Sequence, residues 1–514
     1  MRRVSPSRLL AISLVAVVST GACASRRSEH DIAAAVGAGA VAAAPAAAGE
    51  PATTGGGVAD GAVSGAGAAS PSSAPSAPVT GSNGIAAAPT GTGTASAAPG
   101  TGAASTGRVA TGPAPDRTSA ATPRAGAAAP AAADGPATGP AGSNAAPAGR
   151  SDPLRVGSVS TLSGPVGASL GGGAKAVQAW VAWINAKGGL GGHPVELSIA
   201  DDGSDPARHR ALVQEMTEQK GVVAFVHNAA PLSGQAGVSY IQQKRIPVIG
   251  SEGGSHWVTQ NSMYFPQMSS DPQLADVNAG GFANALVPQN KRKVAFMYCA
   301  EVQGCRAAAS KAAFEKVGLQ VVYEAQVSIA APDYTAQCLG ARNAGAEGVF
   351  VSVDTQSIGR LANNCASVGF KPVFGWPAQV TSDTQLSRPE LDGAIVSNAV
   401  APWFLDTLPA VAEFRAAMTR FAPSVPIDGS AIQGWTSAKL LERAGRSLAA
   451  ATSAEILKGL WSLSGDDLGG LTYPLTFRET DPNNGVNMRM CFFDVRIQSG
   501  RWASPDSGQR HCSQ

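Results

Sequence analysis

Residues 156–206, which read VGSVSTLSGPVGASLGGGAKAVQAWVAWINAKGGLGGHPVELSIADDGSDP, contain a complete strand–helix–strand pattern. The apolar run Val156–Val159 predicts a short buried strand, and a loop of Ser, Thr and Gly follows it. A helix comes next, because apolar residues recur there at helical spacing and form a single stripe. The residues of this stripe are Ala174, Val177, Val181 and Ile184.

Two glycines end this helix, and an acidic turn ends the second strand. We expect Gly188-Gly189 to stop the helix, because only glycine enters the left-handed region at little cost. The strand Val195–Ala200 then leads into Asp201-Asp202. In open α/β sheets, ligands bind at the carboxyl ends of the strands. The Gly/Ser-rich loop after the first strand is therefore a candidate binding loop.

The first 23 residues have the features of an export signal. Three arginines precede the apolar run Leu9–Val18, and small residues then lead to Cys23. The run is too short to span a bilayer. A Cys directly after Gly-Ala resembles that of a bacterial lipoprotein signal, in which the Cys is lipidated, although Thr20 stands where Leu is usual. We expect lipidation of Cys23, with ordinary secretion as the alternative.

Residues 24–151 consist almost entirely of Ala, Gly, Pro, Ser and Thr. Such a segment cannot bury enough apolar surface to offset its ordering entropy, so we expect it to be disordered. A flexible coil of this length would reach roughly 60 Å, enough to hold a domain away from a membrane or to pass through a wall. Compositional drift in a GC-rich genome is a compatible explanation.

The rest of the chain is long enough for two ordinary domains with their own cores. The formal net charge of the whole chain is +2, and no dense stripe of Lys and Arg is present. Nucleic-acid binding therefore has no electrostatic basis in this sequence. After the export signal, no apolar run is long enough to cross a membrane.

Six cysteines follow the candidate lipidation site, an even number that fits an oxidising compartment. Six cysteines allow 15 pairings. Proximity along the chain favours the pairs Cys299–Cys305, Cys338–Cys365 and Cys491–Cys512. No two of them have Cys-x-x-Cys spacing, so we expect no metal site.

Strands continue to alternate with helices beyond the opening unit, which predicts mostly parallel sheets. Asp205-Pro206 is a favourable helix start, with a capping Asp before a Pro in the first turn. Short apolar strands at 222–226 and 246–249 each precede a loop of small polar residues. Near Ser269–Asp271 the pattern begins again and predicts a second sheet. Its predicted strands are 293–297, 319–323, 348–353, 372–374 and 394–399.

Several segments together resemble the Leu/Ile/Val-binding family of ABC-transporter solute receptors. These segments are LSGPVG at 162–167, INAKGGLGGHPVEL at 184–197, DDGSDP at 201–206, RIPVIG at 245–250, DYTAQ at 333–337 and GGLTYPLTF at 469–477. The resemblance is collinear from about Pro153 to the end of the chain. It implies an α/β fold with two doubly wound parallel-sheet lobes joined by three crossing segments.

The family implies a small ligand held between lobes that close on it like a hinge. The crossings would fall near 268–271, 396–402 and 477–485. Lobe I would then comprise residues 152–270 and 399–477, and lobe II residues 271–398 and 478–514. The expected protein is an exported, monomeric receptor without a cofactor, anchored through its N-terminal lipid and delivering its ligand to an ABC permease.

In this family, loops after the lobe-I strands hold the ligand, often an amino acid's carboxylate, through hydroxyls and backbone N–H groups. The residues that the resemblance assigns to this role are Ser163, Ser169, Ser233, Ser251, Gly253 and Ser255. Each serine could equally be a helix cap. The second loop has Ala230-Pro231-Leu232 where relatives have Ser or Thr. The resemblance places a hydrophobic amino acid first among the expected ligands and a small amide or carboxylic acid next, although this departure weakens the match to the amino-acid receptors.

Lobe II should supply an acid for the ammonium group of an amino-acid ligand, yet none follows the predicted strand ending at Phe374. Asp354 could supply this charge from the neighbouring strand end, or it could cap the next helix; Glu301 is a second candidate. Trp376 and Trp257 fall at predicted loop positions, where an aromatic can cover an apolar ligand or simply pack against the lobe.

Enzyme motifs are missing from the sequence. The segment Gly167–Lys175 is Gly-rich but lacks the Gly-Lys-Ser/Thr ending of a phosphate-binding loop. No His-Glu-x-x-His motif occurs, and we expect no nucleophile elbow. We therefore expect a binding protein and not an enzyme. A ligand sensor of the same fold, signalling to a regulatory partner, is the alternative to a transport receptor.

Overall fold

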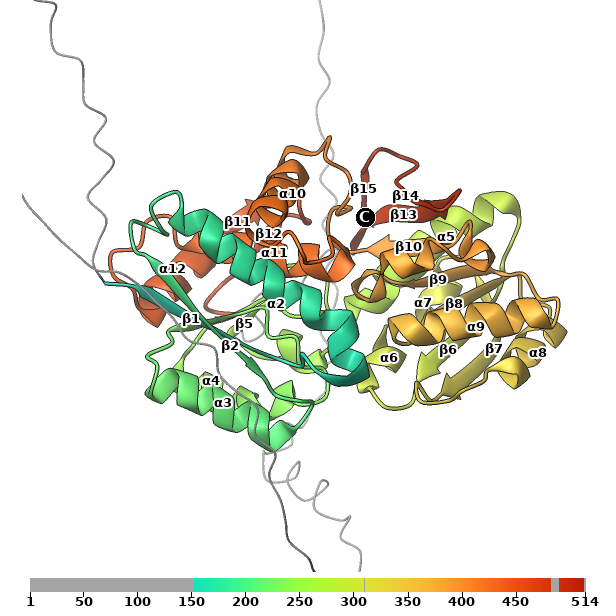
Figure 1. Cartoon of the computed structure of the whole chain (residues 1–514), viewed down its shortest axis with the longest axis horizontal. Helices are drawn as coiled ribbons and strands as arrows, with labels where there is room; N and C mark the ends of the chain where they lie inside the picture. Colours follow the sequence, from blue (N-terminus) through green and yellow to red (C-terminus); the bar gives the residue numbers. More distant parts are fainter. Residues whose placement is uncertain (1–151, 309, 482–489, 513–514) are drawn as a thin grey trace, which may run out of the picture. The chain divides into compact units, whose positions relative to one another are not determined.

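The computed structural model describes residues 152–308, 310–481 and 490–512. The predicted export signal with Cys23 and the predicted tether lie outside these residues, as does part of the predicted third crossing. Among the described residues, no helix combines the length and apolar character needed to cross a membrane. Figure 1 colours the described elements along the sequence.

The first sheet has five parallel strands in the order β2-β1-β3-β4-β5, and we call it and the helices packed on it lobe I. Its strands are β1 (Leu154–Ser160), β2 (Val195–Asp201), β3 (Ala224–Val226), β4 (Val248–Ile249) and β5 (Tyr264–Phe265). The apolar residues of β1 are fully buried, as a parallel sheet covered on both faces requires.

Lobe I contains helices from two parts of the chain. The early helices are α2 (Gly164–Asn185), α3 (Pro206–Glu218) and α4 (Val238–Lys244). The late ones are α10 (Pro409–Phe421), α11 (Gly429–Ala444) and α12 (Ser453–Trp461), followed by the strand pair β11 (Ser464–Asp466) and β12 (Leu475–Thr476). Asp205 caps α3 by accepting from the Arg208 N–H at 2.8 Å, as predicted. The Gly188 and Gly189 φ angles are +98° and +84°, which confirms their predicted left-handed conformation.

The second sheet has eight strands, and we call it and its helices lobe II. Parallel strands β6 (Lys293–Cys299), β7 (Gln320–Val327), β8 (Gly348–Ser352), β9 (Val373–Pro377) and β10 (Ile395–Asn398) form most of it. Strand β13 (Cys491–Gln498) adds antiparallel to β10, and β14 (Arg501–Ala503) and β15 (Arg510–Cys512) pair with β13. The short strand β15 is absent from the sequence prediction.

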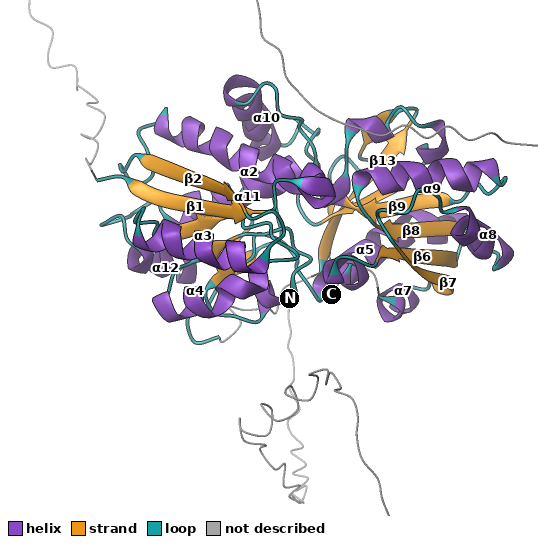
Figure 2. Ribbon diagram, turned by 60° about the horizontal axis from the view of Figure 1, so that its bottom comes forward, coloured by secondary structure: helices purple, strands orange, loops and turns teal. Residues whose placement is uncertain are grey.

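Side chains on opposite faces of the second sheet meet different helices. On one face, Phe296 and Phe350 pack with Phe282 of α5 (Gln273–Leu286) and Phe314 of α7 (Lys311–Lys316). Figure 2 shows α9 (Thr355–Ser367) on the other face, over β8. This division follows from the alternation of side chains along a strand.

The Gly-rich segment that we expected to be a loop is part of a helix. Helix α2 begins at Gly164, about ten residues earlier than its apolar stripe suggests, and it lies beside α11 (Figures 1 and 2). An added Cβ on Gly434 of α11 would lie only 2.1 Å from the carbonyl oxygen of Gly173. Glycine is required there because the two helix backbones touch, and this packing outweighs the low helix propensity of glycine.

The chain crosses between the two sheets three times, which confirms the predicted fold class. It leaves the first sheet between β5 and α5, returns between β10 and α10, and crosses again between β12 and β13. All three predicted disulfides are present: Cys299–Cys305, Cys338–Cys365 and Cys491–Cys512. The second of these joins α8 (Thr335–Asn343) to α9.

Candidate functional site

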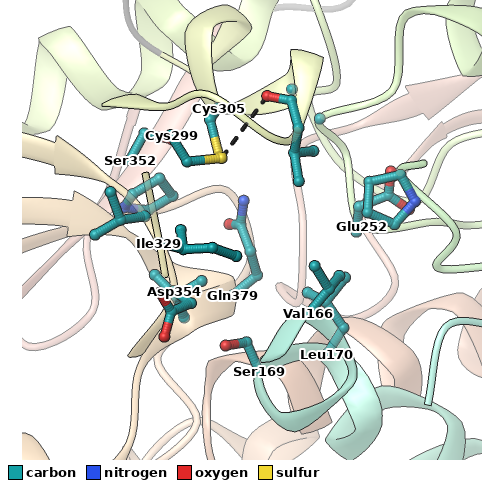
Figure 3. Close-up of a pocket in the computed structure, with 17 residues that line it drawn as sticks. Val166, Ser169, Leu170, Glu252, Cys299, Cys305, Ile329, Ser352, Asp354 and Gln379 are labelled. Carbon is teal, nitrogen blue, oxygen red and sulfur yellow. Dashed lines mark hydrogen bonds between the residues drawn. A yellow bond between two sulfur atoms is a disulfide. The ribbon is translucent and has the colours of Figure 1, made fainter. Parts of the chain in front are cut away.

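A small pocket of about 80 Å³ lies between the two lobes, at the carboxyl ends of their parallel strands (Figure 3). Lobe I contributes one turn of α2 and the loops after β3 and β4; lobe II contributes the segments after β6, β7, β8 and β9. This is the edge at which open α/β sheets bind ligands. The lining residues from lobe I are Val166, Ser169, Leu170, Pro231, Glu252 and Gly254.

The lobe II wall is mostly apolar. It consists of Cys299, Val302, Gly304, Cys305, Ile329, Ser352, Val353, Asp354, Pro377, Gln379 and Val380. The Cys299–Cys305 disulfide closes the short turn between β6 and α6 (Gln303–Ala307), so it holds Val302 and Gly304 at the pocket. Apolar walls with a few placed polar groups are typical of small-molecule sites.

The two lobes touch at the rim of this pocket. The Ser169 hydroxyl lies 3.3 Å from that of Thr355, the first residue of α9, and the Thr355 N–H points to the same oxygen at 3.4 Å. On another side, a Cβ added to Gly304 would lie 2.8 Å from the carbonyl oxygen of Gly254. These contacts join the walls of the pocket directly, so the pocket changes shape whenever the lobes move apart.

Glu252 is the charged group of the lobe I wall. Its side chain is 4% exposed, and one carboxyl oxygen accepts a hydrogen bond from the Ser255 hydroxyl. Within the described residues, its Oε2 atom has no hydrogen-bond partner. Burial raises the pKa of Glu252, and the bond from Ser255 opposes this rise only in part. A buried carboxyl with a free oxygen at a pocket is suited to bind a donor.

Asp354 is the charged group of the lobe II wall, and it also caps α9. Its Oδ1 atom accepts from the backbone N–H groups of Gln356 at 2.9 Å and Ser357 at 3.2 Å. The Ser357 hydroxyl donates to its other oxygen. Asp354 and Glu252 lie on opposite sides of the pocket (Figure 3). The described residues that line the pocket include no Lys, Arg or His.

A family model described as a periplasmic binding protein matches residues 153–501, more than half of the chain. The chain belongs to this family. Its members work outside the cytoplasm and bind small solutes, and the resemblance noted in the sequence is thereby confirmed at the level of family and fold. A search of curated protein sequences found no match.

Solved periplasmic binding proteins share the fold at low identity. A possible leucine/isoleucine/valine-binding protein from Rhodopirellula baltica has 21% identity and a TM-score of 0.59, covering 71% of this chain and 99% of its own. A branched-chain amino acid ABC transporter protein from Thermus thermophilus with bound valine has 16% identity and a TM-score of 0.60, with coverage of 70% and 97%. A fatty acid ABC transporter substrate-binding protein from Thermomonospora curvata has 19% identity and a TM-score of 0.58, covering 72% of this chain and 94% of its own.

Only two of the side chains proposed from the sequence line the pocket of this periplasmic binding protein, Ser169 and Asp354. Ser169 lies inside α2 and not in a loop, because the helix begins at Gly164. Ser163 is the residue just before α2, where it hydrogen-bonds with Asp201 and lowers the pKa of that carboxyl against the effect of burial.

The serines of the second and third loops are engaged within lobe I. The Ser233 hydroxyl donates to Asp202 at 2.7 Å, and Ser233 is fully buried. Ser251 accepts from the N–H of Gly253, and its own backbone N–H and carbonyl both bond the side chain of Gln267. Together with the Ser255–Glu252 bond, these contacts shape the loops from inside.

The acidic turn at the end of β2 organises this network. Asp202 is fully buried and accepts from Thr161, from Ser233, and from the N–H of Ser204, and it pairs with His209 at 2.9 Å. Burial by itself would raise the pKa of Asp202, but these bonds outweigh it and hold the pKa below its usual value. The ends of β1, β2 and β3 are thereby tied together beside the pocket.

Two further candidates from lobe II lie elsewhere. Glu301 is exposed and accepts from the Ser328 hydroxyl at 2.6 Å and the Ile329 N–H at 3.1 Å, so it positions a residue that lines the pocket. Trp376 is not in a loop: β9 extends to Pro377, and the indole is fully buried. Trp257 is also buried, at 8% exposure, in agreement with the packing alternative.

The sequence analysis missed Glu252, Gln379 and the disulfide as parts of the pocket. A glutamate among small residues directly after a buried strand was the available signal for Glu252. Away from the pocket, Asp494, Asp506 and His511 bring three possible metal-ligand atoms together. His511 already bonds Asp506, and Asn284 donates to Asp494. Arg496 lies 3.8 Å from Asp494, which opposes a cation there.

Proposed function

We propose that this protein is the extracytoplasmic solute receptor of an ABC importer, with a small ligand bound in the pocket between the lobes. The observation that supports it most directly is that residues of both lobes line one pocket and touch at its rim. A ligand held by both walls favours the closed form, and an importer can read that form. The similar proteins from Thermus thermophilus, with bound valine, and from Thermomonospora curvata are ABC-transporter proteins, which supports this role.

The mostly apolar lining supports a ligand with an apolar body. The small volume supports a compact ligand.

We propose further that Cys23 carries a lipid and that residues 24–151 tether the receptor to the outer side of the cytoplasmic membrane. Lobe I then comprises residues 152–270 and 399–477, and lobe II the remainder of the folded chain.

A thermal-shift screen of the purified chain tests the receptor function. At least one small solute with an apolar body should raise the unfolding temperature, because a ligand that binds only the folded state stabilises it. A hundredfold excess over the dissociation constant corresponds to about 2.7 kcal/mol. If amino acids, amides, amines and organic acids all leave the unfolding temperature unchanged, the receptor proposal fails.

A further inference from the structure

Glu252 occupies the lobe I position at which the expected ligand groups were hydroxyls and backbone N–H groups. It follows β4 by three residues and lines the pocket from a loop in which every residue except Gly254 is buried. Ser255 bonds one of its carboxyl oxygens, and in the described part of the chain the other has no partner with full hydrogen-bond geometry. The backbone N–H groups of Glu252 and Ala230 also approach the carboxyl and lower its pKa against the effect of burial. A buried polar atom of this kind normally has a partner, and a donor from a water or from a ligand would supply one here.

Most groups that would hold an anion on this wall are engaged elsewhere. The Ser169 hydroxyl lines the pocket but lies 3.3 Å from that of Thr355 in lobe II. Ser233 donates to Asp202, and the backbone groups of Ser251 bond Gln267. Pro231, which lines the pocket from the second loop, has no N–H to offer. The lobe I wall therefore places a buried carboxyl beside the pocket, where a ligand carboxylate would require a donor.

The opposite wall does not compensate for this lack of positive charge. Its charged residue is Asp354, and the described lining residues contain no cation. A carboxylate placed here would lose its hydration beside two acidic groups, which is unfavourable without a partner. A protonated amine would instead gain a partner in Glu252, and the ion pair would offset the burial of that carboxyl.

We propose that the pocket selects a small apolar amine without a carboxylate, whose nitrogen donates to the free Oε2 of Glu252. This inference rests on the proposed receptor function and narrows its ligand class. The apolar body of the amine would lie against the valine, leucine and isoleucine side chains of both walls. Hydrophobic amino acids and carboxylic acids, the first ligands expected from the sequence, are then poor ligands.

Four compounds with the same branched apolar body test this selection: isopentylamine, isovaleramide, isovalerate and leucine. Compounds that carry each head group on a shorter or longer apolar body, including benzylamine, extend the set. The expected result is a rise in unfolding temperature with amines and none with the matching acids or amino acids. If acids, amides or amino acids stabilise the full chain and amines do not, the amine inference is wrong while the receptor function stands. If no compound of any class binds, the receptor function itself fails.

The substitution Glu252→Gln tests the contact, because it keeps the shape and the acceptor for Ser255 but removes the charge. The amine found in the screen should bind about tenfold to a hundredfold more weakly to this variant by calorimetry. Glu324→Gln, at an exposed position on β7, is the matched control and should leave the affinity unchanged. The ligand-free unfolding temperature shows that each variant is folded. Unchanged amine affinity in Glu252→Gln, or a loss in Asp354→Asn alone, would overturn the assignment to Glu252.

Discussion

Replacing Gly434 by alanine is expected to destabilise lobe I, because α11 touches α2 through this residue. An added Cβ would lie 2.1 Å from the carbonyl oxygen of Gly173 and 2.6 Å from its carbonyl carbon and Cα. All three are backbone atoms, so no side-chain rotation relieves the overlap and one helix has to shift. Overpacking of a core costs about 3 kcal/mol at the upper end of the usual range. The better helix propensity of alanine returns about 1 kcal/mol, which leaves a net loss of about 2 kcal/mol.

Gly171→Ala provides a control for this prediction, because it makes the same chemical change within α2. No atom lies within 4 Å of a Cβ at this position. The control should therefore gain up to about 1 kcal/mol from helix propensity alone. The two variants should differ by about 3 kcal/mol, with opposite signs relative to the natural chain.

Urea unfolding followed by tryptophan fluorescence measures both effects. Trp183 of α2 and Trp435 of α11 have ring centroids 6.5 Å apart, so two of the eight tryptophans lie at this helix pair and contribute to the signal. The midpoint should fall for Gly434→Ala and rise slightly for Gly171→Ala. Equal midpoints for the two variants would refute the conclusion that backbone contact between the helices requires glycine.

Three further predictions concern the pocket, a buried histidine and a disulfide. Gly304→Ala places a Cβ 2.8 Å from the Gly254 carbonyl oxygen of the other lobe. Calorimetry should therefore show roughly tenfold weaker binding of any solute found by thermal shift, with an unchanged ligand-free unfolding temperature. Equal affinity would contradict lobe contact in the bound form. Burial lowers the pKa of His227 from 6.5 to about 4. As the pH falls, the unfolded chain therefore binds the proton first, and the free energy of unfolding should decrease by about 3 kcal/mol between pH 6.5 and pH 4. In urea titrations at each pH, this decrease should be smaller by that amount in His227→Asn. Removing the buried Cys338–Cys365 disulfide by alanine substitution should cost about 3 to 4 kcal/mol for a loop of this length; a loss below about 1 kcal/mol in urea unfolding would contradict the estimate.

Local patterns in the sequence were sufficient for most of the fold. The predicted strand 348–353 matches β8, and the predicted strand Val195–Ala200 matches β2. The reason is that alternation of strands and helices, a capping Asp before Pro, and paired glycines act through neighbouring residues. Errors arose where tertiary contacts overrode these signals, as in the glycines of α2.

The sequence located the loops of the pocket but not the side chains that face it. Ser233 and Glu252 are both polar residues just after strands of lobe I, and only one of them lines the pocket. Ser233 bonds Asp202, a residue 31 positions earlier in the chain, and no local pattern encodes that choice.

By itself the sequence determined two α/β lobes, the order of their strands along the chain and the edge at which open sheets of this kind bind ligands, because backbone geometry and apolar periodicity are local properties. The tertiary structure alone decided the chemistry of that edge. It turned the serines of lobe I inward, left one oxygen of Glu252 free, and set Asp354 on the opposite wall. The physical reason is that each polar side chain chooses among partners distant in sequence, and folding determines which partners are within reach.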